Sequence, residues 1–281
     1  METTIWSKQQ RITIAPGQPT VLIGERINPT GKKRLAASLA QKDMSRVQQL
    51  ARSQIEFGAA VLDVNVGAAG VDEVELLPLA VQAVAAITDA PLCLDSPNAE
   101  ALRAALTVYE GKALINSVNG EEASLARVLP LVREYGAAVI ALCMDDNGIP
   151  CDAAGRVAVA RKIVQRAEAT GIPRADILVD CLALSVGTDS TAAAVTLDAI
   201  RGVREELGVN LTLGASNISF GLPDREAINN IFLSLAIAAG VNAPIVNPEQ
   251  AGQSIMITDL LLGRDEFGMN YVTYFRAHPK S

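Results

Sequence analysis

Several short apolar segments of this chain end abruptly on an acidic or amide residue. Four of them lead into Asp95, Asn116, Asp180 and the segment Gly214-Ala215-Ser216-Asn217. The polar groups are carboxylates and carboxamides, with no histidine, cysteine pair or basic residue among them. Such a set suits a flat heterocycle with N–H donors and ring-nitrogen acceptors better than it suits a phosphate or a metal ion.

Two earlier segments follow the same pattern. Glu25 and Asn28 come after the first apolar run, and Asp63 and Asn65 lie at the end of the second. Side chains alternate along a strand, so Asp63 and Asn65 point to the same face. The carboxyl ends of neighbouring parallel strands meet at one edge of a sheet, where α/β folds place their ligands. We therefore expect these residues to converge.

The elements that position them alternate regularly. We expect strands over residues 21–24, 60–64, 92–94, 113–115, 137–142, 177–179, 211–213 and 243–246. We expect helices over residues 45–57, 74–87, 99–109, 124–135, 157–169, 191–207, 225–239 and 253–262. Eight βα units without a composition break predict a (β/α)8 TIM barrel that forms a single domain over residues 1–281.

The N-terminal residues 1–19 are expected to form a hairpin around the turn Ala15-Pro16-Gly17-Gln18, capping the N-terminal end of the barrel. A doubly wound open sheet is the alternative fold. That fold usually has a glycine-rich phosphate turn after its first strand, and residues 24–31 do not have the G-x-G-x-x-G spacing.

Each polar residue also has a purely structural interpretation. Ser96 or Asn98 could cap the helix that follows, and Asn116 could bond to loop backbone. Burying several carboxylates without donors, however, costs several kcal/mol each. The whole set is therefore better explained by a ligand.

Composition excludes other functions. The net charge of −7 without a clustered basic stripe argues against nucleic acid as a partner. No apolar stretch approaches the ~18–20 residues of a membrane span, and the N-terminus lacks the apolar core of a signal peptide, so we expect a cytoplasmic protein.

The four cysteines lack CxxC spacing and are expected to be free thiols, at least Cys93, Cys143 and Cys181 being buried. The only histidine, His278, stands near the end. We expect no metal site.

The motifs together resemble the pterin-binding methyltransferases, and most closely the methyltetrahydrofolate:corrinoid protein methyltransferases of anaerobic bacteria. The matching segments are Gly24-Glu25-Arg26-Ile27-Asn28, Leu62-Asp63-Val64-Asn65-Val66-Gly67, Cys93-Leu94-Asp95-Ser96, Ile115-Asn116-Ser117, Ser216-Asn217-Ile218-Ser219 and Arg225-Glu226-Ala227-Ile228-Asn229. Two positions depart from the family: Cys181 follows Asp180 where proline is common, and Phe220 stands where some relatives have glutamine.

The resemblance implies roles for individual residues. It implies that pterin contacts come from Asn65, Asp95, Asn116, Asp180, Gly214, Ser216, Asn217 and Arg225. It implies that Asn217 hydrogen-bonds N5, the nitrogen that carries the methyl group. The proton that N5 needs would come through a network that includes Asn28, Glu25 or Asp63, among which the sequence does not choose.

The resemblance also implies the partners. The substrate would be tetrahydrofolate or 5-methyltetrahydrofolate, and the corrinoid would sit on a separate corrinoid protein, because this chain lacks an Asp-x-His-x-x-Gly motif in a loop. We also expect a homodimer, since residues 231–237 are apolar without a clear polar face. The pathway, whether acetyl-CoA synthesis, O-demethylation or methylamine or betaine breakdown, stays open.

Two rival functions remain. Dihydropteroate synthase is another pterin-binding barrel, but it needs cations for a pyrophosphate, and residues 181–187 and 216–220 contain none. A barrel that binds folate without catalysis is the other.

Overall fold

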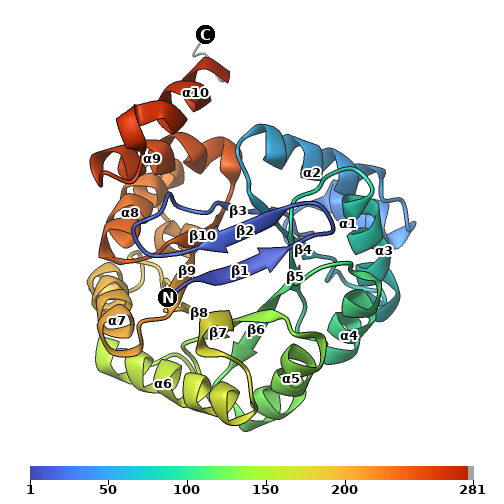
Figure 1. The fold of residues 1–281 in the computed structure, drawn as a ribbon, viewed down its shortest axis with the longest axis horizontal. Helices are drawn as coiled ribbons and strands as arrows, with labels where there is room; N and C mark the ends of the chain where they lie inside the picture. The colour runs from blue at the N-terminus through green and yellow to red at the C-terminus, as the bar shows by residue number, and fades with distance from the viewer. Residues whose placement is uncertain (278–281) are drawn as a thin grey trace.

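Eight parallel strands form a closed barrel in this computed structural model, which describes residues 1–277. The strand order is β10-β3-β4-β5-β6-β7-β8-β9, and β10 pairs with β3 to close the ring (Figure 1). The strands are β3 (Ile23–Ile27), β4 (Val61–Asn65), β5 (Leu92–Asp95), β6 (Leu114–Asn119), β7 (Ala138–Leu142), β8 (Ile177–Asp180), β9 (Asn210–Gly214) and β10 (Ala243–Val246). The predicted TIM barrel is confirmed.

Helices surround the barrel on its outer face (Figure 1). They are α1 (Lys33–Ala40), α2 (Ser45–Glu56), α3 (Glu73–Ala85), α4 (Ala99–Val108), α5 (Glu122–Tyr135), α6 (Ala153–Ala169), α7 (Ala192–Leu207), α8 (Arg225–Ala239), α9 (Pro248–Leu261) and α10 (Met269–Ala277). Short 3₁₀ turns are η1 (Arg174–Asp176), η2 (Ala215–Ser219) and η3 (Glu266–Gly268). The larger apolar core lies between the strands and these helices.

A second, smaller core fills the inside of the barrel. It contains one aliphatic or small side chain from most strands, such as Ile23, Val61, Leu114 and Leu178, all of them fully buried. Bulky branched residues pack well inside such barrels, so the interior is solid and leaves the two ends to carry polar chemistry.

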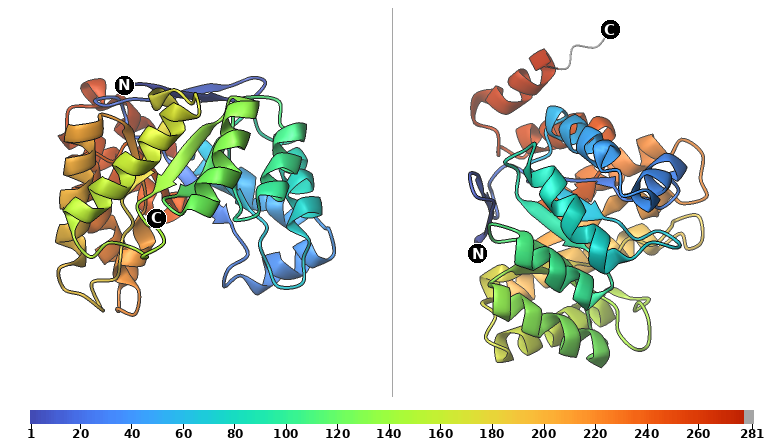
Figure 2. Two further views of the ribbon diagram at one scale, coloured as in Figure 1. Left: turned by 90° about the horizontal axis from the view of Figure 1, so that it is seen from below. Right: turned by 90° about the vertical axis from the view of Figure 1, so that its right-hand side faces the viewer.

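The N-terminal hairpin covers one end of the barrel. Its strands β1 (Thr3–Trp6) and β2 (Arg11–Ile14) pair antiparallel and lie across the barrel, away from the long loops at the other end (Figure 2). Ile5 and Ile14 are fully buried against the inner core. Bonds from Trp6 to Lys112, just before β6, and from Thr3 to Ala175, just before β8, identify this as the N-terminal end.

Two buried asparagines fasten the hairpin. The Nδ2 of Asn210 donates to Thr3 Oγ1 at 2.8 Å and to the carbonyl of Ile14 at 2.9 Å. Its Oδ1 accepts from Asn242 Nδ2 at 2.6 Å, and Asn242 Oδ1 accepts from the N–H of Leu211 at 3.0 Å. The network uses neutral groups whose donors and acceptors find partners, as burial requires.

The hairpin turn was predicted in the wrong place. The strands are joined by residues 7–10, where Ser7 Oγ accepts from the N–H groups of Gln9 and Gln10. The segment Ala15-Pro16-Gly17-Gln18 does turn, with Gly17 at φ +76°, but it leads from β2 towards β3. Both are turn-compatible sequences, and packing of Ile5 and Ile14 on the same side selects the first.

Two helices were not predicted, and one starts earlier than expected. Helices α1 and α10 were not expected from the sequence, and α9 begins at Pro248 instead of residue 253. Proline is favoured in the first turn of a helix, since its missing N–H is not needed there. Within residues 1–277, no helix is both long and apolar enough to cross a membrane.

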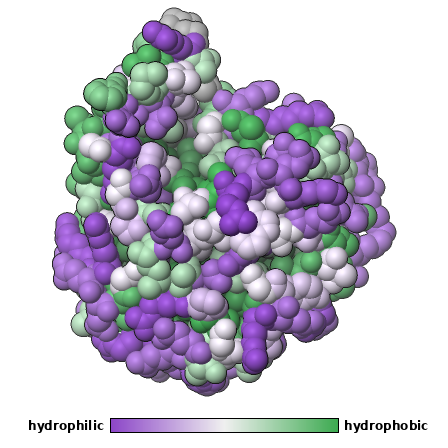
Figure 3. All heavy atoms as spheres, in the orientation of Figure 1, coloured by the Kyte–Doolittle hydropathy of each residue, from purple (hydrophilic) through white to green (hydrophobic). Residues whose placement is uncertain are grey.

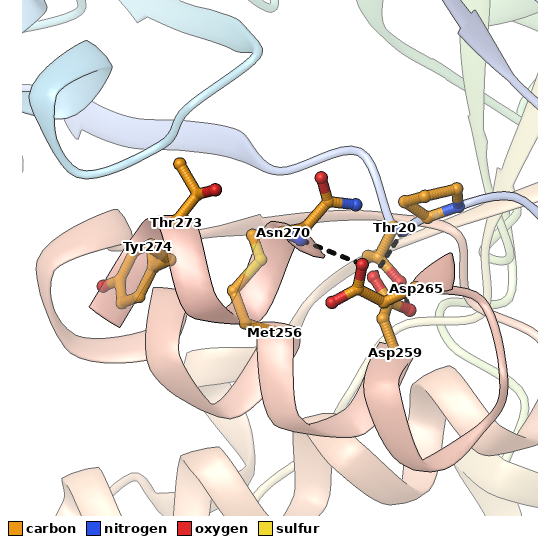
Figure 4. Close-up of a pocket in the computed structure, with 8 residues that line it drawn as sticks. Thr20, Met256, Asp259, Asp265, Asn270, Thr273 and Tyr274 are labelled. Atoms are coloured by element: carbon orange, nitrogen blue, oxygen red, sulfur yellow. Dashed lines mark hydrogen bonds between the residues drawn. The ribbon is translucent and has the colours of Figure 1, made fainter. Parts of the chain in front are cut away.

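Helix α10 projects from the barrel (Figure 2), and none of its residues is buried. The chain reaches it through Asp265, whose carboxylate accepts from the N–H groups of Asn270 and Tyr271 at 2.9 Å each. Nearby, Asp259 accepts from the N–H and hydroxyl of Thr20 at 2.7 Å each (Figure 4). Asp265 thus holds the start of α10, Asp259 ties Thr20 to α9, and α10 itself extends outward.

We expect the Asn210→Ala substitution to lower the free energy of unfolding by roughly 2–4 kcal/mol, because several buried donors and acceptors lose their partners. Urea denaturation followed by circular dichroism measures the change. The control is Asn147→Ala, an exposed asparagine in the loop after β7, which should change stability by less than about 0.5 kcal/mol. Equal stabilities of the two variants would contradict the role of the network.

Candidate functional site

The end of the barrel opposite the hairpin carries the predicted polar residues. Asp95 and Asp180 are the last residues of β5 and β8, whereas β4 continues past Asp63 to Asn65 and β6 continues past Asn116 to Asn119. Because β4, β5 and β6 are neighbours, Asn65 pairs in register with Asp95, and Asp95 pairs with Asn116. The expected convergence is therefore found at this mouth of the barrel.

Asp63 and Asn116 are in direct contact. The Nδ2 of Asn116 donates to Asp63 Oδ1 at 3.2 Å. Asp63 is 3% exposed, and burial raises its pKa well above the usual range, with the nearby charge of Asp95 adding to the rise. Asp63 is thus a carboxyl group that tends to hold its proton. Asn116 bonds this side chain and not loop backbone.

Asp95 is held by Asn65. The Asn65 amide donates to Asp95 Oδ2 at 2.9 Å, and its Oδ1 accepts from the N–H of Gly67 at 2.8 Å. Burial raises the pKa of Asp95 to about 6, and the charge of Glu73 adds to the effect. Glu73, which the sequence did not single out, also accepts from Ser96 Oγ at 2.5 Å.

Asp180 is buried at the end of β8, and both of its oxygens accept backbone bonds. Oδ1 accepts from Leu182 N–H at 2.7 Å and Oδ2 from Gly214 N–H at 3.2 Å. Burial raises the pKa of Asp180 to about 6 in spite of these bonds. Each oxygen keeps a free lone pair, so the carboxylate can accept two further N–H donors. A side chain at Gly214 would meet open space, so a flat ligand can approach there.

Arg156 supports the loop after Asp180, a role that was not predicted from the sequence. It lies on α6, is 1% exposed, and donates to the carbonyls of Cys181 and Leu182 at 3.0 and 2.7 Å. Its charge lowers the pKa of Asp180, opposing the larger effect of burial. Within α6 an arginine is an ordinary surface residue, and only the tertiary structure reveals that it is buried.

Asn217 and Ser216 lie in η2, directly after β9. Asn217 is exposed, and its side chain has no hydrogen bond within residues 1–277. Arg225 at the start of α8 donates to the Ser216 carbonyl at 2.8 Å and to Ser219 Oγ at 3.0 Å, and lies over the Phe220 ring at 5.9 Å. Arg225 therefore shapes the loop that carries Asn217.

Glu25 faces a small cavity, whereas Asn28 uses part of its side chain in a turn. Glu25 and Ser216 line one small cavity of about 30 Å³, and burial raises the pKa of Glu25. The Asn28 Oδ1 accepts from Thr30 N–H at 2.9 Å, so half of its amide is used within a turn. Asn229 also lines this cavity, and its buried Oδ1 has no partner in the described part of the chain.

A larger polar pocket of about 290 Å³ opens beside Asp95 and Asn116. Ser117, Asn119 and Arg127 are among its other lining residues. It is thus concave, rich in hydrogen-bonding groups and continuous with the buried carboxylates. Across residues 1–277, His, Cys, Asp and Glu side chains form no group that could hold a metal ion, and His278 lies outside the described residues.

Comparison with known proteins identifies the family. The model of the family described as "Pterin binding enzyme" matches residues 24–247, a span that contains every residue of the mouth discussed above. This chain belongs to the pterin-binding enzyme family. The resemblance found in the motifs of the sequence is confirmed.

Relatives of this chain include a methyltransferase and two methionine synthases. The chain is 31% identical over 264 residues to a methylcorrinoid:tetrahydrofolate methyltransferase of Eubacterium limosum, covering 91% of this chain and 96% of that protein. It is 32% identical over 259 residues to methionine synthases of Mycobacterium leprae and Mycobacterium tuberculosis. There the match covers 88% of this chain but 22% of each relative, so this pterin-binding enzyme corresponds to a fraction of their length.

Solved structures confirm the fold. DHPS of Yersinia pestis superposes with a TM-score of 0.69 at 18% identity, covering 94% of this chain and 99% of that one. Dihydropteroate synthase of Stenotrophomonas maltophilia gives a TM-score of 0.68 at 18% identity, covering 92% and 98%. At this identity the likeness concerns the barrel of this pterin-binding enzyme and not its reaction.

We expect Asp180 to make stability depend on pH. The folded protein holds the Asp180 proton up to a pKa of about 6, whereas the ordinary value is 3.8, so the wild type loses stability as the pH rises between these values. Asp180→Asn lacks this titration. Relative to the wild type it should gain about 3 kcal/mol over this interval.

Urea denaturation of both proteins between pH 4 and pH 8 measures the difference. The control is Asp189→Asn: hydrogen bonds from Thr191 lower the pKa of Asp189 below its ordinary value of 3.8, so this group titrates below the measured range and the stability difference should stay nearly constant. A stability difference between wild type and Asp180→Asn that stays constant with pH would show that burial does not raise this pKa.

Proposed function

We propose that this pterin-binding enzyme transfers a methyl group between N5 of tetrahydrofolate and the cobalt of a corrinoid bound to a separate protein. The observation that carries the proposal is the set of carboxyl groups at the mouth, the buried Asp63 and Asp180 and the partly buried Asp95, accompanied by Asn116. The identity of 31% along nearly the whole Eubacterium limosum methyltransferase supports it.

The pterin edge suits Asp180. A pterin ring presents N3–H and a 2-amino group side by side, and a carboxylate with two free lone pairs accepts both. Asp180 has such lone pairs and is held in place by Leu182, Gly214 and Arg156. These donors would also stabilise its ionised form, which burial alone disfavours. Asn116 and Asp95 then face the remaining ring nitrogens.

Asn217 and Glu25 suit the chemistry at N5. When the methyl group leaves, N5 keeps the electron pair of the broken bond and must take up a proton. The free amide of Asn217 can donate to N5 as that charge develops. Glu25 shares a cavity with Ser216, next to Asn217, and its raised pKa suits a proton donor. Asp63 and Asn28 suit the role of proton donor less well. Asp63 already accepts a hydrogen bond from Asn116, and Asn28 Oδ1 accepts one from Thr30 N–H within a turn.

The corrinoid supplies the strong nucleophile that a methylated amine requires, and in the reverse direction the methyl group. Phe220, close to Asn217 on the rim, is 68% exposed and offers its ring to a flat group on another protein. The rival pyrophosphate chemistry lacks support, because residues 181–187 and 216–220 contain no lysine or arginine. The nearest cation on η2 and α8, Arg225, is bonded to Ser216 and Ser219.

Methyl transfer from 5-methyltetrahydrofolate to free cob(I)alamin, followed by the corrinoid absorption bands, tests the proposal. We expect turnover that depends on the enzyme and on folate. Folate binding without transfer to free cobalamin or to corrinoid proteins would favour the non-catalytic barrel. Absence of folate binding would overturn the proposal altogether.

We expect Asn217→Ala to lower the single-turnover rate of methyl transfer by about 10²-fold, as for the loss of one preorganised donor. Folate affinity should fall less than the rate, because the bond strengthens as the carbon–nitrogen bond breaks. Stopped-flow kinetics at saturating folate measures the rate, with Asn147→Ala as the control. Strongly weakened binding with an unchanged rate would make Asn217 an anchor only.

We also propose that the enzyme is a homodimer through the surface of α8, α9 and α10. Figure 3 shows apolar residues on the side formed by α9 and α10. Exposed apolar side chains there are Ile231, Leu235, Leu261, Leu262, Phe267, Met269 and Phe275, of which Leu261 is 80% and Phe267 91% exposed. Half of the apolar residues of α8 are buried, including Phe232 and Leu233, so burial within the chain explains only part of its pattern.

The length of α10 favours a second copy as the partner. A helix of nine residues is marginal on its own, and none of its residues is buried against the barrel. An apolar surface of this extent on a protein marks an interaction site. In a two-fold dimer the same surface of each copy would cover the other.

We expect sedimentation at micromolar concentration to give twice the chain mass of 29.5 kDa. The double substitution Leu261→Glu and Phe267→Glu should yield monomers, because it places charges in the apolar interface. Leu79→Glu, at an exposed apolar position of α3 on another side, should leave the mass unchanged. A wild type that sediments as a single chain would exclude the dimer.

A further inference from the structure

A second concave site lies between α2 and α9, just outside the mouth. These two helices are neighbours because β10 and β3 pair to close the barrel. The hollow between them measures about 230 Å³, and its lining includes Arg26, Arg46, Gln54, Asn247 and Glu249. It is large enough for a small charged group and is separate from the buried carboxylates.

Within the described part of the chain, neither arginine of this hollow forms an ion pair. Arg26 follows Glu25 on β3, so it faces the helices while Glu25 faces the barrel interior. Among residues 1–277, no carboxylate lies within 4.0 Å of the Arg26 or Arg46 guanidinium, and Arg46 bonds only the Gln49 amide oxygen. Burial, together with the charge of Arg26, lowers the pKa of Lys32, and the same charge opposes the rise that burial causes in the pKa of Glu25.

Gln54 adds a buried donor without a partner. It is 2% exposed, and its Oε1 accepts from the N–H of Arg26 at 2.7 Å. That bond fixes the orientation of the Gln54 amide. The amide nitrogen Nε2 then points away from Arg26 N–H and has no hydrogen-bond partner in the described chain. Buried N–H groups are nearly always bonded. An acceptor in the hollow would satisfy Nε2 together with the guanidinium groups.

The N-terminal end of α9 also favours an anion in the hollow. This helix of 14 residues begins with Pro248 and has no side chain capping its first turn. Pro248 has no N–H, and Gln250 and Ala251 donate to the Asn247 carbonyl at 3.2 and 3.0 Å, so the N–H of Glu249 is the unbonded donor of this turn among the described residues. That donor and the helix dipole attract an anion. Glu249 is the acidic residue of the lining; it is exposed and forms no ion pair within residues 1–277. Two cations, an unpaired donor and a helix end therefore outweigh one exposed acid.

The hollow adjoins the catalytic side of the mouth. Asn247 lines both this hollow and the small cavity that holds Glu25 and Ser216. A folate whose N5 lies at Asn217 has its aminobenzoyl-glutamate tail attached next to N5, on this same side. The tail ends in carboxylates, which are the groups that arginine and amide donors recognise.

We propose that the hollow between α2 and α9 binds the glutamate carboxylates of the folate tail, with Arg26 and Arg46 as its specificity-determining residues. The inference rests on the proposed function, because it assumes a folate in the mouth. It assigns to this site a preference for the complete folate over a pterin without a tail.

Calorimetric titration with two ligands tests the inference: 5-methyltetrahydrofolate, and 5,6-dimethyltetrahydropterin, which has the ring but no tail. We expect Arg26→Gln and Arg46→Gln each to weaken folate binding by about tenfold, as for the loss of one charge-assisted contact. Binding of the tailless pterin should change less than about twofold. Glu249→Gln should tighten folate binding, because it removes the competing carboxylate.

Arg52→Gln is the matched control, since Arg52 is an exposed arginine of the same helix α2. Circular dichroism confirms folding, and Arg46→Gln decides the question if Arg26→Gln is unstable. Folate binding that is unchanged in the variants, with normal pterin binding, would overturn this inference alone. A wild type that binds neither ligand would overturn the proposed function and the tail site together.

Discussion

Three carboxyl groups that are withdrawn from water at one end of the barrel are the constraint on which the neighbouring structure depends. Asp63, Asp95 and Asp180 lie at strand ends where burial raises the pKa of each. Desolvating a carboxylate costs several kcal/mol unless donors compensate. The donors present, from Asn116, Asn65 and the backbone, compensate only in part. The site therefore favours a ligand that brings its own N–H groups.

The two ends of the barrel handle burial of polar groups in opposite ways. At the hairpin end, Asn210 and Asn242 are neutral, and their amides bond to each other and to nearby backbone and side-chain groups. That end is a structural closure. At the mouth the polar groups are ionisable and keep unused lone pairs, and Gly214 leaves space in front of them. Stability resides at one end of the strands, and we infer that ligand recognition resides at the other, as barrels of this kind commonly arrange.

Most of the barrel and the strand-end residues of its mouth could be predicted from the sequence, because short buried strands that stop on a polar residue leave a local signal. Asp180 is an example: an apolar run precedes it and a loop follows. Arg156 and Gln54 leave no such signal, since each occupies an ordinary helical position and acts only through residues distant in the chain. Helix α1 was missed because it has only eight residues, and its apolar signal consists of Leu35 and Leu39, buried one turn apart.

The pairing of Ile23 with Ile245 joins the first barrel strand to the last. Closing so long a loop carries an entropic cost before any of its contacts form, and such non-local topologies fold slowly. During synthesis on a ribosome, β3 must wait with an unpaired edge until β10 has emerged. The N-terminal hairpin also lacks its buried hydrogen-bond partners until late in synthesis, because Asn210 and Asn242 are translated shortly before β10. A nascent chain of this protein thus depends longest on protection from aggregation at its own beginning.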